Sequence, residues 1–158
     1  MNYRFITIWY IEAPIHAVSE AICHSLSWPH WWRNVERVEE IAPGDALGIG
    51  SVRRYTWRGH LPYRLTFDVR VIHFEPLAVI EGIASGDLEG QGRWSFTSDG
   101  AVTVVRYEWQ VRTTLPWMNL LALFARPFFK WNHNAVMHQG GEALARRLNA
   151  RLVEIAHS

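Results

Sequence analysis

The stretch that decides the fold is Tyr63-Arg64-Leu65-Thr66-Phe67-Asp68-Val69-Arg70-Val71, in which apolar and polar residues alternate without a break. An alternation with a period of two places successive side chains on opposite faces of a β-strand. One face of this strand is therefore expected to be buried and the other to be wet, which is typical of an antiparallel sheet. His73 continues the alternation on the apolar side, so we expect it to point inward.

The segments on either side extend this sheet. Strands are predicted over residues 3–12, 35–42, 51–58, 77–85, 88–97 and 101–114, which are rich in β-branched and aromatic residues. Turns that contain glycine or proline separate them, as in Ser98-Asp99-Gly100. Consecutive strands joined by short turns predict a seven-stranded antiparallel meander.

Three helices complete the predicted elements. Two short ones cover residues 14–25 and 28–34, each with a proline at its start. A long one covers residues 117–156 and is expected to kink near Pro127. Its inward stripe is predicted to hold Leu120, Phe124, Phe128, Trp131, Ala135 and His138, and then Leu144, Leu148, Leu152 and Ile155. The fold class is therefore α+β, with the sheet curved around the C-terminal helix, and residues 1–158 are expected to form one domain.

Composition excludes several classes of function. The chain has 158 residues, of which 49% are hydrophobic and 20% charged, which is typical of a globular domain. Its net charge of +1, with the two signs interspersed, argues against nucleic acid as a partner. Cys23 is the only cysteine, so neither an intrachain disulfide nor a thiolate metal cluster can form, and a cytoplasmic location is expected. No uncharged stretch reaches the roughly 18 residues that span a bilayer.

The chain resembles the polyketide cyclase/dehydrase-like branch of the START superfamily, which has the helix-grip or birch-pollen-allergen-like fold. The matching features are Ala13-Pro14, Trp28-Pro29-His30-Trp31-Trp32-Arg33-Asn34, Gly50-Ser51-Val52, Gly86-Asp87-Leu88-Glu89-Gly90, Trp94-Ser95-Phe96 and Tyr107-Glu108-Trp109. The resemblance covers essentially the whole chain and the same order of elements. It implies a cavity between sheet and long helix that holds a small hydrophobic ligand such as a lipid, a polyketide or a quinone. No catalytic motif is shared across the family, so catalytic residues remain unknown.

Aromatic residues dominate the predicted cavity wall. The chain has 9 Trp, 7 Phe and 5 Tyr residues, and large rings serve cores and ligand cavities alike. The predicted ligand-binding residues are Trp32, Tyr55, Trp57, Phe67, Trp94, Tyr107 and Trp109, together with Phe128 and Trp131 of the long helix. The alternative is that these rings fill a solid core and that any cavity is vestigial.

Two histidines are added to this wall. His73 and His138 fall on the predicted inward faces, where an imidazole can orient a ligand carbonyl or hydroxyl or transfer a proton. The alternative for each is a buried structural histidine. His16, Glu20 and His24 have a spacing that can bind a metal, but their face of the helix is expected to be solvated and no fourth ligand is evident. We therefore predict no metal site and no cofactor.

Three hypotheses about function remain open. The first is a binding or transport protein for a hydrophobic ligand. The second is an enzyme of the polyketide cyclase or dehydratase type that uses His and Tyr as acid–base groups. The third is a protein-interaction module. The segment Leu115–Trp131 is apolar around more than one helix face. Such a surface is suited to contact with a membrane surface or with a protein. The alternative is that the segment forms the lid of the cavity and the first half of the core helix.

Overall fold

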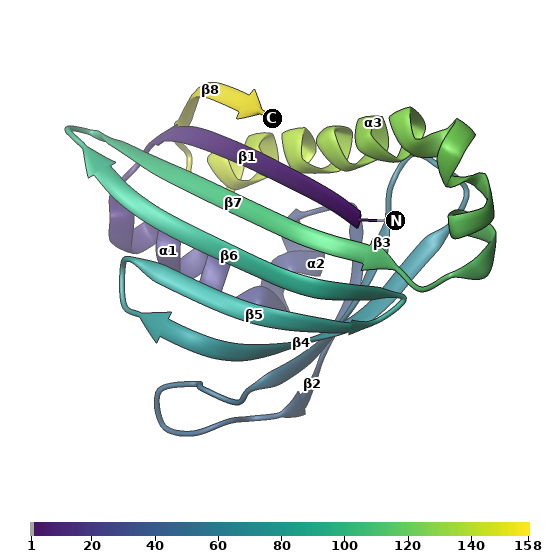
Figure 1. The fold of residues 1–158 in the computed structure, drawn as a ribbon. Helices are drawn as coiled ribbons and strands as arrows, with labels where there is room; N and C mark the ends of the chain where they lie inside the picture. Colours follow the sequence, from purple (N-terminus) through teal and green to yellow (C-terminus); the bar gives the residue numbers. More distant parts are fainter. Residues whose placement is uncertain (1) are drawn as a thin grey trace.

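The computed structural model describes residues 2–158, and its centre is one antiparallel sheet of eight strands. In the sheet they follow the order β2-β3-β4-β5-β6-β7-β1-β8, so β2 and β8 are its two edges (Figure 1). The strands are β1 (Asn2–Glu12), β2 (Val35–Ala42), β3 (Val52–Arg58), β4 (Arg64–Glu75), β5 (Val79–Gly86), β6 (Leu88–Asp99), β7 (Val102–Thr113) and β8 (Arg151–His157). The predicted α+β fold class and the meander from β2 to β7 are confirmed.

The strand β4 keeps the predicted alternation only as far as Val71. Phe67 is buried, but the pairing with β5 shifts between Val71 and His73, where an extra residue forms a β-bulge. The shift reverses the two faces of the strand, so Phe74 rather than His73 lines the interior. The inward orientation predicted for His73 is therefore wrong: its side chain is half-exposed, and its Nε2 lies 3.5 Å from Oε1 of Glu75.

Two short α-helices follow β1, as the sequence predicts. They are α1 (Ile15–Cys23) and α2 (Trp28–Trp31), with a short 3₁₀ turn, η1 (Ser25–Ser27), between them. The helix α2 ends three residues before its predicted limit at Asn34. Trp32 follows α2 at once and is completely buried, with its indole N–H donating to the carbonyl of Val136 at 3.2 Å. This bond ties the short helices to the long one.

The long helix α3 (Pro116–Arg147) lies along the concave side of the sheet (Figure 1). Its axis bends in the first half, and Pro127, which cannot donate a backbone hydrogen bond, lies inside it. Gly140 and Gly141 meet the indoles of Trp32 and Trp9, and a Cβ atom at either glycine would clash with these rings. This close approach fixes the rotation of the helix.

That rotation differs from the predicted one in the first half of α3. Leu120, Phe124, Phe128 and Trp131 are exposed by 79%, 82%, 61% and 53%, whereas Met118, Ala122 and Phe129 face the sheet. His138 is also exposed, and its Nε2 lies 2.6 Å from Oε1 of Glu142. The predicted inward stripe is therefore wrong for Leu120, Phe124, Phe128, Trp131 and His138. In residues 117–131 apolar side chains extend around more than one face of the helix, so their periodicity alone does not define which side faces inward.

The predicted end of the long helix is also wrong. The helix stops at Arg147, Asn149 adopts a positive φ of 50°, and residues 151–157 pair with β1 as the eighth strand. Asn is one of the few residues that tolerate this left-handed conformation, which ends the helix. Leu152 and Ile155 still pack on the core, but they do so from a strand.

Candidate ligand cavity

Two adjoining cavities lie between the sheet and the helices. The first, which we call the α3 cavity, has a volume of about 120 Å³ and is lined by β-strands and by α3 from Met118 to Met137. The second, the α1 cavity, has a volume of about 260 Å³ and is lined by the end of α1, the loop that joins β2 to β3, and strands β3 to β7. Both are lined by one group of rings, the aromatic partition: Trp28, Trp57, Phe67, Trp94, Tyr107 and Trp109.

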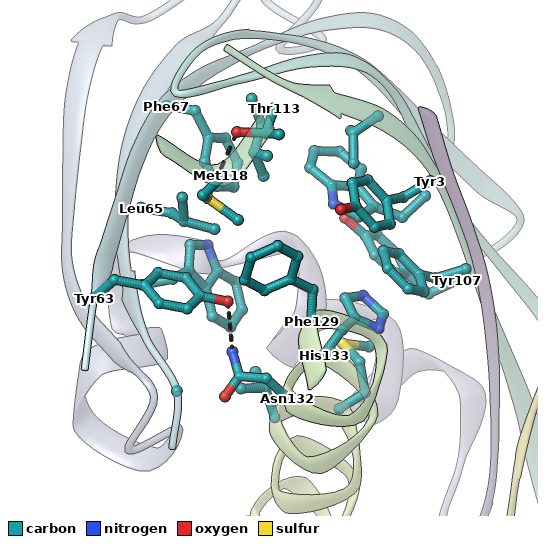
Figure 2. Close-up of a pocket in the computed structure, with 18 of the residues that line it drawn as sticks. Tyr3, Tyr63, Leu65, Phe67, Tyr107, Thr113, Met118, Phe129, Asn132 and His133 are labelled. Carbon is teal, nitrogen blue, oxygen red and sulfur yellow. Dashed lines mark hydrogen bonds between the residues drawn. The ribbon is translucent and has the colours of Figure 1, made fainter. Parts of the chain in front are cut away.

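The wall of the α3 cavity is mostly apolar. Strand residues with the same alternation contribute Tyr3 and Phe5 from β1, and α3 contributes Met118 and Phe129 from its inner side (Figure 2). Phe129 meets the ring of Tyr63 edge-on, with centroids 6.0 Å apart. An apolar wall of this kind binds a ligand chiefly through removal of apolar surface from water.

Asn132 fixes one side of this cavity. Its Oδ1 accepts hydrogen bonds from the backbone N–H groups of His60 at 2.7 Å and Leu61 at 3.3 Å. Its Nδ2 donates to the hydroxyl of Tyr63 at 3.1 Å (Figure 2). Because Tyr63 accepts this bond, its own hydroxyl proton is available to a ligand. The loop between β3 and β4 is therefore held against α3 by one buried amide.

His133 places an imidazole in the wall of the α3 cavity. Its ring stacks on Phe5 with centroids 3.9 Å apart, and burial lowers its pKa to about 3. The imidazole is therefore neutral at physiological pH. Its Nδ1 and the hydroxyl of Tyr3 are buried, and neither has a hydrogen-bond partner among the residues that the structure describes. Buried polar atoms are normally satisfied, so these two are positioned to bond a polar group of a ligand or a water.

The α1 cavity is more polar. Arg53 of β3 donates from Nη1 to the carbonyl of Cys23 at 3.1 Å and to Oγ of Ser25 at 2.7 Å. The hydroxyls of Ser25 and Tyr55 share a hydrogen bond of 2.8 Å. Burial raises the pKa of Tyr55 and of Tyr107, so both phenols stay neutral and keep a proton to donate.

The structure brings together most of the predicted wall and separates the rest from it. Trp32, Tyr55, Trp57, Phe67, Trp94, Tyr107 and Trp109 line one cavity or both. His73, Phe128, Trp131 and His138 lie outside both, because of the bulge in β4 and the rotation of α3. A role in ligand binding stays a prediction for the residues that do line the cavities.

Sequence reasoning missed several residues of the wall. Tyr3 and Phe5 share the inward alternation of the first strand, and Arg53 shares the side of Tyr55 and Trp57, so their pattern was readable. Asn132 and His133 were not readable, because their inward orientation depends on the rotation of α3. His16, Glu20 and His24 do not converge, and no metal-binding group of His, Cys, Asp or Glu occurs within residues 2–158.

Comparison with solved structures identifies the fold. The chain is similar to a START superfamily protein from Mycobacterium smegmatis, with 14% identity, a TM-score of 0.75, and coverage of 93% of this chain and 98% of the other. It is similar to the Zhui aromatase/cyclase from Streptomyces sp. R1128 at 15% identity and a TM-score of 0.71, covering 94% of each chain. Norcoclaurine synthase from Thalictrum flavum matches at 10% identity and a TM-score of 0.62, again over 94% of each.

The chain therefore has the helix-grip fold of the START superfamily. Within that class its structural neighbours include aromatase/cyclases, which confirms the predicted resemblance to the polyketide cyclase-like branch at the level of the fold. No protein-family model and no curated protein sequence matches the chain. In the described part of the chain, no helix combines the length and the apolar character needed to cross a membrane.

Proposed function

We propose that the protein binds, and thereby carries, a small and mostly apolar ligand in the space between its sheet and α3. The supporting observation is the α3 cavity, an apolar space whose buried polar atoms on Tyr3 and His133 have no protein partner among the described residues. Apolar burial would supply affinity at about 25 cal/mol per Å² before ordering costs. The polar atoms would set the orientation of the ligand. The cytoplasm, inferred from the single cysteine, is the location we propose.

A ligand would enter the cavity next to the exposed apolar side of α3. The α3 apolar face, which we define as Leu120, Leu123, Phe124, Phe128 and Trp131, is exposed by 53% to 82%. It lies on the outer side of the helix whose inner side lines the α3 cavity. Residues 109–141 contain no Asp or Glu, whereas Arg126 and Lys130 lie within this stretch. Such a surface is suited to transient contact with an anionic membrane, from which a lipid-like ligand would be taken up; a protein partner is the alternative.

A cyclase or dehydratase reaction is the second candidate. The observation in its favour is a neutral imidazole, His133, in the cavity wall. A pKa of about 3 makes this imidazole a weak base, however, and efficient general bases have pKa values near the operating pH. The electrostatics of His133 therefore favour binding over proton abstraction.

The test combines native mass spectrometry of freshly purified protein with uptake of N-phenyl-1-naphthylamine, a neutral fluorescent apolar probe. We expect a retained apolar molecule or saturable probe uptake. Met118→Trp should fill the α3 cavity and lower uptake to what the adjoining α1 cavity still takes up, because Met118 is buried and lines only the α3 cavity. The matched control is Leu120→Trp on the exposed side of the same helix. Empty protein without probe uptake, or equal uptake by both variants, would reject the proposal.

A further inference from the structure

Arg53 lines the α1 cavity, and a purely apolar ligand does not explain why a charged side chain lies there. Among the described residues, the other arginines without an ion pair are all exposed: Arg33, Arg70, Arg126, Arg146 and Arg147. Arg53 is partly buried, lines the cavity and also has no carboxylate partner among these residues. Removing a charge from water is unfavourable unless it is paired and hydrogen-bonded. The guanidinium therefore has a charge that the described chain leaves uncompensated.

The hydrogen bonds of Arg53 position it without neutralising it. Nη1 makes both contacts, to the carbonyl of Cys23 at the end of α1 and to Oγ of Ser25. Nε is buried and has no partner within residues 2–158. A purely structural role, bonding the last turn of α1, needs only a donor to that carbonyl. That structural role does not account for the N–H groups of Arg53 other than those on Nη1.

The acidic residues nearby are exposed or already paired. Glu81 lines the same cavity, but Nη1 of Arg93 lies 2.8 Å from its Oε1. Asp68 is held by Arg54 at 2.8 Å, and Glu40, which pairs with Arg53 across the β2–β3 ladder, is exposed. The polar end of the α1 cavity is therefore electropositive. The hydroxyl of Tyr55, bonded to Ser25, lies at the same end.

We propose that the α1 cavity binds the carboxylate of a ligand that has a flat apolar body. Arg53 provides the counter-ion, Tyr55 and Ser25 provide hydroxyl groups, and the aromatic partition receives the flat body. A planar guanidinium matches the geometry of a carboxylate better than any other side chain. The rings of Trp94 and Tyr107, with centroids 4.1 Å apart, present the kind of surface on which a flat ring system packs. This inference rests on the proposed function, because it names the ligand class for the same interior.

The test uses two probes that share a naphthalene body and differ in the polar group, the anionic 2-naphthoate and the neutral 2-naphthalenemethanol. Each is titrated into the purified protein by calorimetry. We expect the carboxylate to bind at least tenfold more tightly than the alcohol. In Arg53→Met this preference should disappear while the affinity for the alcohol is kept. The matched control is Arg54→Met, since Arg54 is the next residue, is exposed, and pairs with Asp68 outside the cavity; it should keep the preference.

The possible results separate the two proposals. If neither probe binds, the proposed function and this inference both fail. If both bind with equal affinity to the unmodified protein, the ligand cavity stands and the carboxylate site is rejected. That comparison needs no variant, so it decides the matter even if Arg53→Met does not fold. Equal loss of preference in Arg54→Met and Arg53→Met would also reject the site, because it would indicate a general effect of net charge.

Discussion

Two glycines of α3 determine how closely this helix packs against the tryptophans of the core. Trp32 is completely buried, yet no large side chain faces it from α3, because Gly140 stands there. The same relation holds between Trp9 and Gly141. A large ring opposite a glycine brings α3 close to Trp32 and to β1 at this point, directly beside the α3 cavity, which Trp32 also lines.

The first prediction at this scale concerns Gly140. In an exposed helix, Gly→Ala stabilises by about 0.5–1 kcal/mol. Gly140→Ala should instead destabilise by about 1–3 kcal/mol, because the new methyl group would clash with the indole of Trp32. Urea denaturation measures the change in the free energy of unfolding. Lys130→Ala, at an exposed site of the same helix, should change it by less than about 0.5 kcal/mol. A stabilising Gly140→Ala would show that the contact is loose.

The second prediction concerns pH and His133. The folded protein lowers the pKa of His133 from 6.5 to about 3, so between these values the unfolded chain binds the proton more readily. The contribution of neutral His133 to the free energy of unfolding is therefore fully present above pH 6.5 and is lost as the pH decreases toward 3. The slope should approach about 1.4 kcal/mol per pH unit, the limit for a single proton. His133→Gln should flatten this decline between neutral and mildly acidic pH, as measured by urea denaturation at each pH.

The control for this prediction is His30→Gln, which changes an exposed histidine of α2 and should leave the decline unchanged. Burial also lowers the pKa of His157, so some slope should persist in both variants. Identical pH profiles for His133→Gln and the unmodified protein would mean that His133 is not buried as described.

At the scale of elements, the sequence predicts the strands in which polar and apolar residues alternate. It does not predict the orientation of a helix segment whose apolar residues extend around more than one face. The strands β4, β6 and β7 are readable because polar and apolar residues alternate in them, and β1 is readable because it is rich in β-branched and aromatic residues. In the first half of α3 apolar residues extend around more than one face, so its inner side follows from contacts made elsewhere, at Gly140 and Asn132. Residues 151–157 carry apolar residues at a spacing compatible with a helix, and only pairing with β1 makes them a strand. The bulge in β4 has no signal in its own sequence.

A prediction at this scale tests the α3 apolar face. Phe124→Glu combined with Phe128→Glu should reduce binding to vesicles of phosphatidylcholine and phosphatidylglycerol by more than about tenfold, because each buried Phe contributes roughly 1.5–3 kcal/mol. Co-sedimentation measures the bound fraction. Thermal unfolding should change little, since both rings are exposed. The control is Ile83→Glu on an exposed site of β5, which should keep vesicle binding. If both proteins bind equally, α3 is not the membrane contact.

At the scale of the whole molecule, the order of elements predicted a long helix across the concave side of a curved sheet, and the family resemblance implied the space between them. Most of the aromatic wall followed from strand alternation. The polar character of the interior followed only in part. Arg53 shares the inward side of Tyr55 and Trp57 in β3, whereas the inward orientation of Asn132 and His133 depends on the rotation of α3. A resemblance carried by structural motifs therefore indicates where a ligand would lie, whereas the side chains of this chain determine which ligand is suited to it.

The order of strands also governs how the molecule behaves beside other copies of itself. An open sheet edge exposes unpaired backbone groups that can recruit another chain into a growing aggregate. Here β2 carries Glu36, Arg37, Glu39 and Glu40, and its pairing with β3 is interrupted by register shifts at both ends. The opposite edge is the short strand β8, which covers β1 and carries Arg151 and Glu154. Charge, irregularity and short length thus protect an aromatic-rich sheet from joining edge to edge.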